Sequence, residues 1–248
     1  MARIIKKDDR LMQEYMCNKK NRNICWMVVA ACFLLFLCVG TFIGGTFQAI
    51  APILVVVFIG SGILGGYFSN KTQSLYSGIE GENTTADIIS MLPDTYCGFQ
   101  NIKVTYEGKT SELDMVVVGP TGVFVIETKN LNGTIVGHYD NPQWIQEKIG
   151  RKGTPYSKNF YNPIKQVGTH VYRLAKCLKS NGVRVYVQSM VYFSNPDTVI
   201  RVNGKPSETP VFSAFENSAN EIRKYILENE PLISGTEVQK IANLLARQ

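Results

Sequence analysis

Four charged side chains interrupt the most apolar part of the chain, the segment SELDMVVVGPTGVFVIETKN at residues 111–130. They are Glu112, Asp114, Glu127 and Lys129. Charged side chains are rarely buried unless they are paired with each other or bind a metal ion. The apolar runs 113–118 and 123–128 are typical of buried strands, so a sheet must bring these charges together.

The turn between the two runs decides which charges meet. It contains Pro120, which cannot take the positive φ of the primed hairpin turns, so the turn must be built around type I or II. If the strands pair symmetrically about Pro120-Thr121, Asp114 faces Glu127 with the Cβ atoms about 5 Å apart. Because side chains alternate with a period of two, Glu112 would then face Lys129 on the same side.

A second register is equally compatible with the sequence. A one-residue bulge at Gly122 would shift the pairing by one, and a kink at Asp114 would then be needed to bring Asp114 and Glu127 together. The sequence alone leaves both registers open.

Two carboxylates this close repel each other unless a cation lies between them. Mg²⁺ binds oxygen ligands, keeps several waters and uses one or two carboxylates. Asp114 and Glu127 are therefore candidate ligands for Mg²⁺ or Mn²⁺. Lys129 would point the same way as Glu127, where it would orient or help deprotonate an attacking water, or stabilise charge on a phosphate. A cross-strand ion pair with an additional acid is the structural alternative.

Apolar periodicity and turn residues predict the elements that must position these side chains. The helix predicted last begins at Ser234, where Glu237 three residues later indicates a capping box. The order is helix, three strands, helix, strand and further short elements, which indicates a mixed α/β fold. The predicted helices are 82–92, 162–180, 214–227 and the one from 234; the predicted strands are 99–108, 113–118, 123–128, one within 183–193, and two near residues 199 and 211.

Three motifs together resemble the nuclease-related domain family, NERD, over residues 77–194. They are GIEGE at 78–82, ELDMVVVGPTGVFVIETKN at 112–130 and NPIKQ at 162–166. The Asp…Glu-x-Lys pattern also resembles the signature of the PD-(D/E)XK nucleases. The resemblance implies a restriction-endonuclease-like mixed sheet flanked by helices, and metal-dependent hydrolysis of phosphodiester bonds in DNA or RNA.

Carried over position by position, the resemblance implies five catalytic residues: Glu82, Asp114, Glu127, Lys129 and Gln166. Asp114 and Glu127 would bind the metal with the Thr128 carbonyl, and Lys129 would be the catalytic lysine. Taken singly, Glu82 also fits a carboxylate at a helix start, favoured by the helix dipole, and Gln166 also fits a solvated side chain.

The histidine and cysteine contents narrow the chemistry. The chain has only two histidines, which argues against histidine-based nucleases and zinc hydrolases. His170 is interpreted as a helix-surface or interface residue. The six cysteines form neither a C-x-x-C pair nor a dense framework, so reduced thiols in a cytosol-facing protein are expected.

A basic stretch without any acidic residue runs from Lys148 to Pro196. Phosphate contacts dominate affinity for nucleic acids, and aromatic rings stack on unpaired bases. We predict nucleic-acid contacts here, although a solvated face or contact with anionic lipid headgroups would give the same composition. No motif for sequence-specific readout is present. The predicted contact residues are Lys148, Arg151, Lys152, Lys158, Lys165, Arg173 and Lys176.

Residues 23–70 carry no charge, and 48 residues are about twice what one membrane span needs. Two transmembrane helices are predicted, at about 25–44 and 49–68, with a turn near residues 46–48. A cleaved signal peptide is the alternative, but its apolar core would be shorter. The arm at 1–24 has seven Lys/Arg and three acids, which predicts a cytoplasmic location for it.

Two spans return the chain to the cytoplasm, so the sequence predicts a multi-pass protein of the cell inner (cytoplasmic) membrane. Residues 71–194 would form the nuclease-like domain, and residues 195–248 an extension that packs on it. Two other functions fit the same residues. One is a non-catalytic module that binds nucleic acid or protein at the membrane; the other is recruitment of partners through the basic arm.

Overall fold

The computed structural model describes the chain except for residues 7, 43–46, 151–152, 217 and 229. It divides into two compact units. Residues 10–79 form a helical unit, and residues 1–9 together with 80–248 form a mixed α/β unit. The α/β unit contains two sheets flanked by helices, as predicted.

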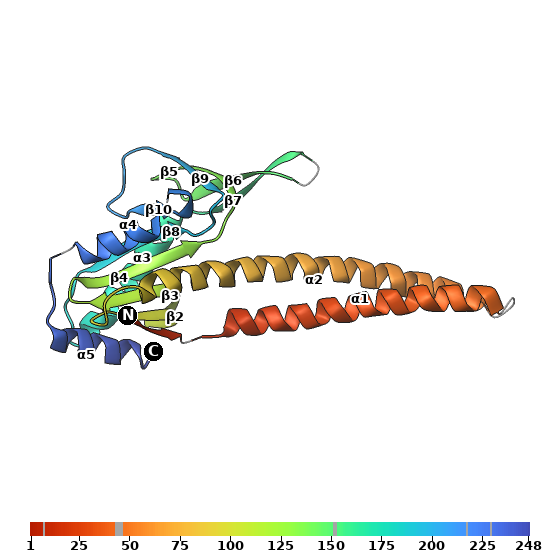
Figure 1. Cartoon of the computed structure of the whole chain (residues 1–248), viewed down its shortest axis with the longest axis horizontal. Helices are drawn as coiled ribbons and strands as arrows, with labels where there is room; N and C mark the ends of the chain where they lie inside the picture. Colours follow the sequence, from red (N-terminus) through yellow and green to blue (C-terminus); the bar gives the residue numbers. More distant parts are fainter. Residues whose placement is uncertain (7, 43–46, 151–152, 217, 229) are drawn as a thin grey trace. The chain divides into compact units, whose positions relative to one another are not determined.

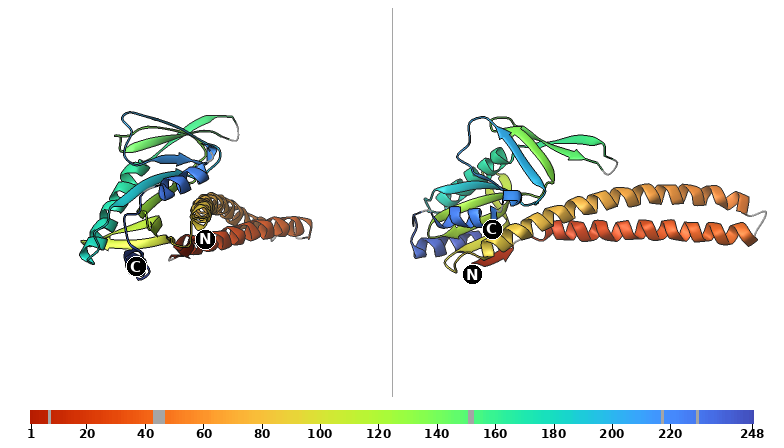
Figure 2. Two further views of the ribbon diagram at one scale, coloured as in Figure 1. Left: turned by 60° about the vertical axis from the view of Figure 1, so that its left-hand side comes forward. Right: turned by 45° about the horizontal axis from the view of Figure 1, so that its top comes forward.

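The helical unit is a hairpin of two long helices, α1 (Arg10–Phe42) and the first part of α2 (Phe47–Ser90), which lie side by side in Figures 1 and 2. Their contacts are antiparallel, because Tyr15 of α1 meets Tyr76 of α2 at 5.9 Å between ring centroids. Both helices are long and apolar enough to cross a membrane. The turn predicted near residues 46–48 falls partly outside the described residues.

The apolar surface of the hairpin is unusually exposed. Phe33, Leu34, Val56 and Ile63 are all more than half exposed. Soluble proteins rarely leave an apolar patch of this extent in water. The polar residues of the hairpin lie near the start of α1 and after the apolar part of α2, where Lys71 pairs with Glu14 at 2.9 Å.

The larger sheet has six strands in the order β1-β2-β3-β4-β8-β10 (Figure 1). β2, β3 and β4 are antiparallel neighbours, whereas β1, β8 and β10 join in parallel. The strands are β1 (Arg3–Lys6), β2 (Cys97–Tyr106), β3 (Lys109–Gly119), β4 (Gly122–Lys129), β8 (Val187–Phe193) and β10 (Val211–Ser213).

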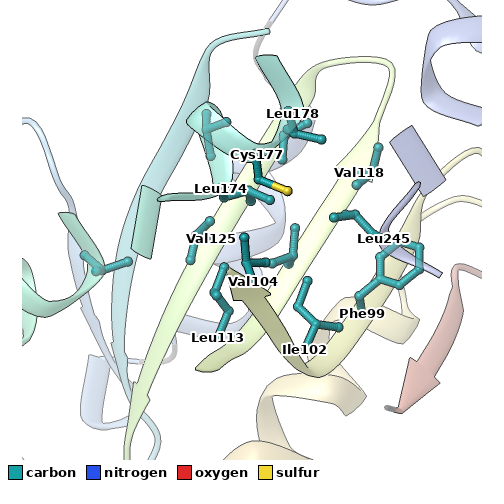
Figure 3. Packing of buried hydrophobic residues seen from close by; sticks show 14 of the residues in the cluster. Phe99, Ile102, Val104, Leu113, Val118, Val125, Leu174, Cys177, Leu178 and Leu245 are labelled. Carbon is teal, nitrogen blue, oxygen red and sulfur yellow. The ribbon is translucent and has the colours of Figure 1, made fainter. Parts of the chain in front are cut away.

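Helices cover both faces of this sheet because its central strands are apolar on both sides. α3 (Pro163–Ser180) and α5 (Gly235–Leu245) pack on one face, where Val125, Leu174 and Leu245 belong to one core cluster (Figure 3). The end of α2 and α4 (Ser218–Leu227) cover the other face. A short 3-10 turn, Ala214–Glu216, precedes α4.

A second sheet, with the order β7-β6-β5-β9, was not predicted over residues 133–161. β7 is exposed along most of its length and β5 has a single fully buried residue, so these strands lack the apolar alternation that identifies a strand. The buried Trp144 anchors this sheet by stacking on Phe193 of β8, with ring centroids 6.4 Å apart. The strands are β5 (Gly133–His138), β6 (Gln143–Ile149), β7 (Pro155–Tyr161) and β9 (Thr198–Asn203).

One predicted helix start agrees with the structure and another does not. The capping box at Ser234 and Glu237 is confirmed. The helix predicted from residue 82 is wrong at its start, because α2 runs without interruption from Phe47 to Ser90. A change of composition from apolar to polar does not end a helix when the backbone hydrogen bonds continue.

The first residues of the chain belong to the α/β unit. β1 pairs in parallel with β2 along the sheet edge, with Lys6 opposite Gln100. The Ala2 amide donates to the carbonyls of Ser90 and Leu92, at 3.1 and 2.7 Å. The predicted basic arm therefore contains an edge strand and the beginning of α1.

Candidate active site

The symmetric register about Pro120-Thr121 is confirmed. Gly119 pairs with Gly122, and the ladder continues to Met115 opposite Ile126. Gly122 has φ +133°, which glycine tolerates without strain, and no bulge shifts the register there. This register brings the acid of β3 next to the acid of β4.

Glu127 lies on β4, between β3 and β8. Its side chain is only 1% exposed. Strand alternation places it on the same face as Val125, which packs under α3. A carboxyl in such a position needs a partner, a proton or a cation.

Lys129 is the partner that the structure provides. Its Nζ donates to Glu127 Oε1 at 2.8 Å and to Gln166 Oε1 at 3.0 Å. The β3–β4 ladder ends at Met115 opposite Ile126, so Glu112 is not in register with Lys129; on the other side of β3, Glu112 lies opposite Lys103 of β2. Gln166 is thus a half-buried member of the site.

Asp114 lies at a break in the β-ladders on both of its sides. Pairing with β4 stops at Met115, and pairing with β2 omits Asp114 and Asn101 between two regular pairs. The Asp114 Oδ2 accepts a hydrogen bond from the Thr128 amide at 2.8 Å. The strand is therefore distorted at Asp114 although the register is the symmetric one. From the sequence, a kink at Asp114 was expected only with the register shifted by a bulge.

Burial and mutual repulsion control the charge of the two acids. Burial, together with the negative charge of Asp114, raises the pKa of Glu127 to about 8, although Lys129 opposes this shift. Burial also raises the pKa of Asp114, against the Thr128 hydrogen bond and Lys129. The protein alone therefore favours a proton at this pair, and a cation would replace that proton.

His170 was interpreted as a surface or interface residue, and the structure places it inside the site. Its Nδ1 lies 3.4 Å from Glu127 Oε2, and the residue is 8% exposed. Burial, with Lys129 and Arg173 nearby, lowers the His170 pKa to about 4, so the imidazole is neutral at pH 7. The available signal was its position one helical turn after Gln166.

The end of α2 supplies the other side of the site. Glu82 is half-buried and accepts a hydrogen bond from Asn101 Nδ2 at 2.8 Å. Its pKa is raised by burial and further by Asp114, although the Asn101 bond opposes the shift. Thr85 Oγ1 lies 2.8 Å from Thr128 Oγ1.

Gly81, the second glycine of the GIEGE motif, lies where α2 packs closely against the ends of two strands. A Cβ at this position would lie 2.8 Å from Asn130 Cβ and from Ser194 Oγ. Only glycine allows α2 to approach the ends of β4 and β8 this closely, and the approach brings Glu82 and Thr85 to the site.

The described residues contain no cluster of three or more His, Cys, Asp and Glu side chains arranged to hold a metal ion. The donor set is instead a pair of carboxylates, Asp114 and Glu127. Glu127 Oε2 is buried and has no hydrogen-bond partner in the described part of the chain. This composition fits Mg²⁺ or Mn²⁺, which use one or two carboxylates and keep several waters.

The predicted nucleic-acid contacts fall on two elements. Lys148 and Lys158 lie on one face of the β6–β7 ribbon; burial, and then Lys158, lowers the Lys148 pKa. On α3, Lys165 is exposed, and Lys176 lies 5.4 Å from the Tyr172 ring centroid. Arg173 is held by Ser111 Oγ and the Thr110 carbonyl. Arg151 and Lys152 lie outside the described residues.

Residues 77–194 match the family model of NERD, the nuclease-related domain. This chain carries a nuclease-related domain. The matched range runs from the end of α2 through β8 and contains all five predicted catalytic residues.

One curated relative is similar over a longer range. It is an uncharacterized protein of Bacillus anthracis, 29% identical over 175 residues, which are 69% of this chain and 76% of the relative. The similarity therefore extends beyond the NERD match. No solved structure matches the chain.

Proposed function

We propose that this protein is a metal-dependent nuclease that is anchored in the cytoplasmic membrane and hydrolyses phosphodiester bonds of DNA or RNA. The observation that carries the proposal is the arrangement of Asp114, Glu127 and Lys129 inside a nuclease-related domain. Asp114 and Glu127 are two acids with raised pKa values, and Lys129 is held between Glu127 and Gln166.

Asp114, Glu127 and the Thr128 carbonyl would hold Mg²⁺ or Mn²⁺. When bound, the ion neutralises the two carboxylates and polarises the scissile phosphate. The main-chain amide of Thr128 already fixes the Asp114 carboxylate at 2.8 Å. This bond leaves the acid oriented before any substrate arrives, which lowers the reorganisation required during reaction.

Lys129 would act on the attacking water and on the phosphate. Its ammonium is fixed by two oxygen acceptors, so its position beside Glu127 is defined. From there it orients the nucleophile and stabilises negative charge as it develops on the phosphate. Gln166 would position Lys129 through its hydrogen bond, and Glu82 would add a carboxylate from α2 next to Asp114.

The nucleic-acid backbone would be held by lysines of the β6–β7 ribbon and of α3. Lys158 and Lys165 are exposed and have the charge that phosphates attract. Arg173 already donates hydrogen bonds to Thr110 and Ser111 of β3, so its main role would be to fix α3 to β3 and not to bind phosphate. Binding should therefore weaken as salt rises, without strong sequence preference.

The proposal is tested by cleavage assays on the full chain in detergent, with labelled single- and double-stranded DNA and RNA. Cleavage is expected with Mg²⁺ or Mn²⁺, and it should disappear with EDTA and in Asp114→Asn. This substitution keeps the side-chain shape and removes the charge. Asp114→Asn protein that cleaves like the parent would contradict the metal site. Salt-sensitive binding without any cleavage would favour a non-catalytic nucleic-acid-binding module.

Membrane anchoring is supported by the uncharged segment 23–70 and the exposed apolar side chains of the hairpin. Residues 1–9 and 80–248 form one unit, so a hairpin that crosses the bilayer leaves both on the same side. The seven Lys/Arg of residues 1–24 favour the cytoplasmic side.

Fractionation and fusion proteins test this orientation. In a bacterial host, the chain should stay in the membrane pellet after a carbonate wash and be released by detergent. Green fluorescent protein at the C-terminus should fluoresce, whereas alkaline phosphatase there should be inactive, because its disulfides need an oxidising compartment. An active phosphatase fusion would place the domain on the other side.

A further inference from the structure

Asn101 has an unusual conformation at a point that the proposed mechanism does not use. It is 4% exposed, and its φ is +56°, in the left-handed region. Among non-glycine residues asparagine is one of the few that adopt this region readily. In the β2–β3 register, Asn101 stands opposite Asp114, where the regular pairs on either side leave a gap.

The side chain of Asn101 joins two segments that are far apart in the sequence. Its Nδ2 donates to Glu82 Oε2 at 2.8 Å and to the Asp8 carbonyl at 3.4 Å. The Asp8 carboxylate in turn pairs with Lys103, two residues further along β2. The left-handed conformation thus allows one amide to reach both helix α2 and the segment that follows β1.

We propose that Asn101 is a positioning residue, which holds the Glu82 carboxylate at the candidate active site and ties the first nine residues of the chain to it. This inference rests on the proposed function, because it assigns Glu82 a role there. The segment that follows β1 then contributes to the same contact, because its Asp8 carbonyl accepts a hydrogen bond from the amide that holds Glu82.

Asparagine meets both requirements of the position, a left-handed backbone and a side-chain donor. Glycine would accept the backbone conformation at no steric cost but has no amide to donate. Aspartate would also tolerate the conformation, but its carboxylate would face the Glu82 carboxylate and the Asp8 carbonyl, and these acceptors would repel it. Both substitutions therefore keep the backbone conformation and remove the hydrogen bond to Glu82.

The experiment is a double-mutant cycle of Asn101→Gly and Glu82→Ala in the full chain. A hydrogen bond to a charged group predicts that Asn101→Gly lowers kcat by about tenfold or more, with KM within about twofold. Asn101→Gly should add little to the loss already caused by Glu82→Ala, because the amide acts through that carboxylate. Asn101→Asp should be at least as impaired as Asn101→Gly.

Thermal denaturation of the parent, the two single variants and the double variant of the cycle provides a measurement that does not depend on catalysis. Coupling between the two substitutions in Tm is expected, since each removes one partner of the same bond. A cleaving parent with no coupling in either kcat or Tm would overturn the positioning role alone. A parent that does not cleave would overturn the proposed function, and the positioning role would fall with it, whatever the Tm cycle shows.

The contact with the N-terminal strand is tested by Lys103→Ala, which removes the ion pair to Asp8 and leaves Asn101 intact. Faster proteolysis of residues 1–9 and a smaller loss of kcat than in Asn101→Gly are expected. A loss of kcat as large as that of Asn101→Gly would show that strand docking, and not the Asn101–Glu82 bond, controls the site.

Discussion

Replacing Lys129 with alanine is expected to lower kcat for phosphodiester cleavage by about 10²- to 10³-fold, the usual effect of removing one preorganised charge-stabilising group. The substitution removes the ammonium that Glu127 and Gln166 hold at 2.8 and 3.0 Å. Binding of nucleic acid should change little, because the exposed lysines of the ribbon and α3 are kept. Kinetics and salt-dependent binding of one preparation measure both effects.

The folding of Lys129→Ala should survive the loss of this ion pair. Truncating one partner of a buried pair is usually destabilising because a buried charge remains. Here Glu127 already has a pKa of about 8 in the metal-free protein, so it is mostly protonated at pH 7 and leaves no unpaired buried charge when the lysine is gone. Circular dichroism should therefore show a folded protein at pH 7.

A matched control is Lys224→Ala on α4, where an exposed lysine lies 3.7 Å from Glu228. It removes the same side chain from a surface ion pair and should leave kcat unchanged. Undiminished cleavage by Lys129→Ala would refute the catalytic role of the lysine. Equal losses in the two variants would point to a general effect of charge.

The pH dependence of stability should reveal the buried carboxyl of Glu127. Its folded pKa, about 8, lies above the ordinary value of 4.5. Between these values the folded state keeps a proton that the unfolded state has released, so unfolding releases a proton. Raising the pH from about 5 to about 8 therefore destabilises the metal-free protein, by an amount on the order of a few kcal/mol.

Glu127→Gln should remove most of this slope. Glutamine has nearly the same shape and does not titrate, so the Tm of the variant should fall less than that of the parent between pH 5 and pH 8. Thermal melts in EDTA at several pH values measure the difference. Glu228→Gln, at an exposed carboxylate just after α4, is the control, and its slope should equal that of the parent.

Added Mg²⁺ should act in the opposite direction to protons. The ion binds the ionised carboxylates, so it must displace the proton of Glu127 at low pH and meets less competition at high pH. The rise in Tm caused by Mg²⁺ should therefore increase from pH 6 to pH 8 in the parent and be much smaller in Glu127→Gln. Equal rises in the two proteins would place the cation elsewhere.

Local patterns in the sequence were sufficient for much of the fold. The alternating and continuous apolar runs gave the strands of the hairpin at 113–128, since burial of apolar side chains is what makes such runs into central strands. The uncharged segment 23–70 gave two long apolar helices, and Ser234 with Glu237 gave the start of α5. Each of these signals acts over a few neighbouring residues.

The second sheet and the N-terminal strand could not be predicted in this way. β7 is exposed along most of its length, and β1 has only four residues. Their pairing is decided by backbone hydrogen bonds to strands far away in the sequence, and these bonds leave little trace in side-chain composition. Trp144 was visible as an aromatic residue, but its stacking on Phe193 was not.

By itself, the sequence determined which side chains are available for chemistry: Asp114, Glu127, Lys129 and, on the next helix of the chain, Gln166. It also restricted the hairpin to two registers, because a strand repeats every two residues. Only the tertiary structure decided between those registers, brought His170 to Glu127, and turned Asn101 toward Glu82 and Asp8. These contacts join residues from separate elements, and their distances depend on how helices pack on the sheet.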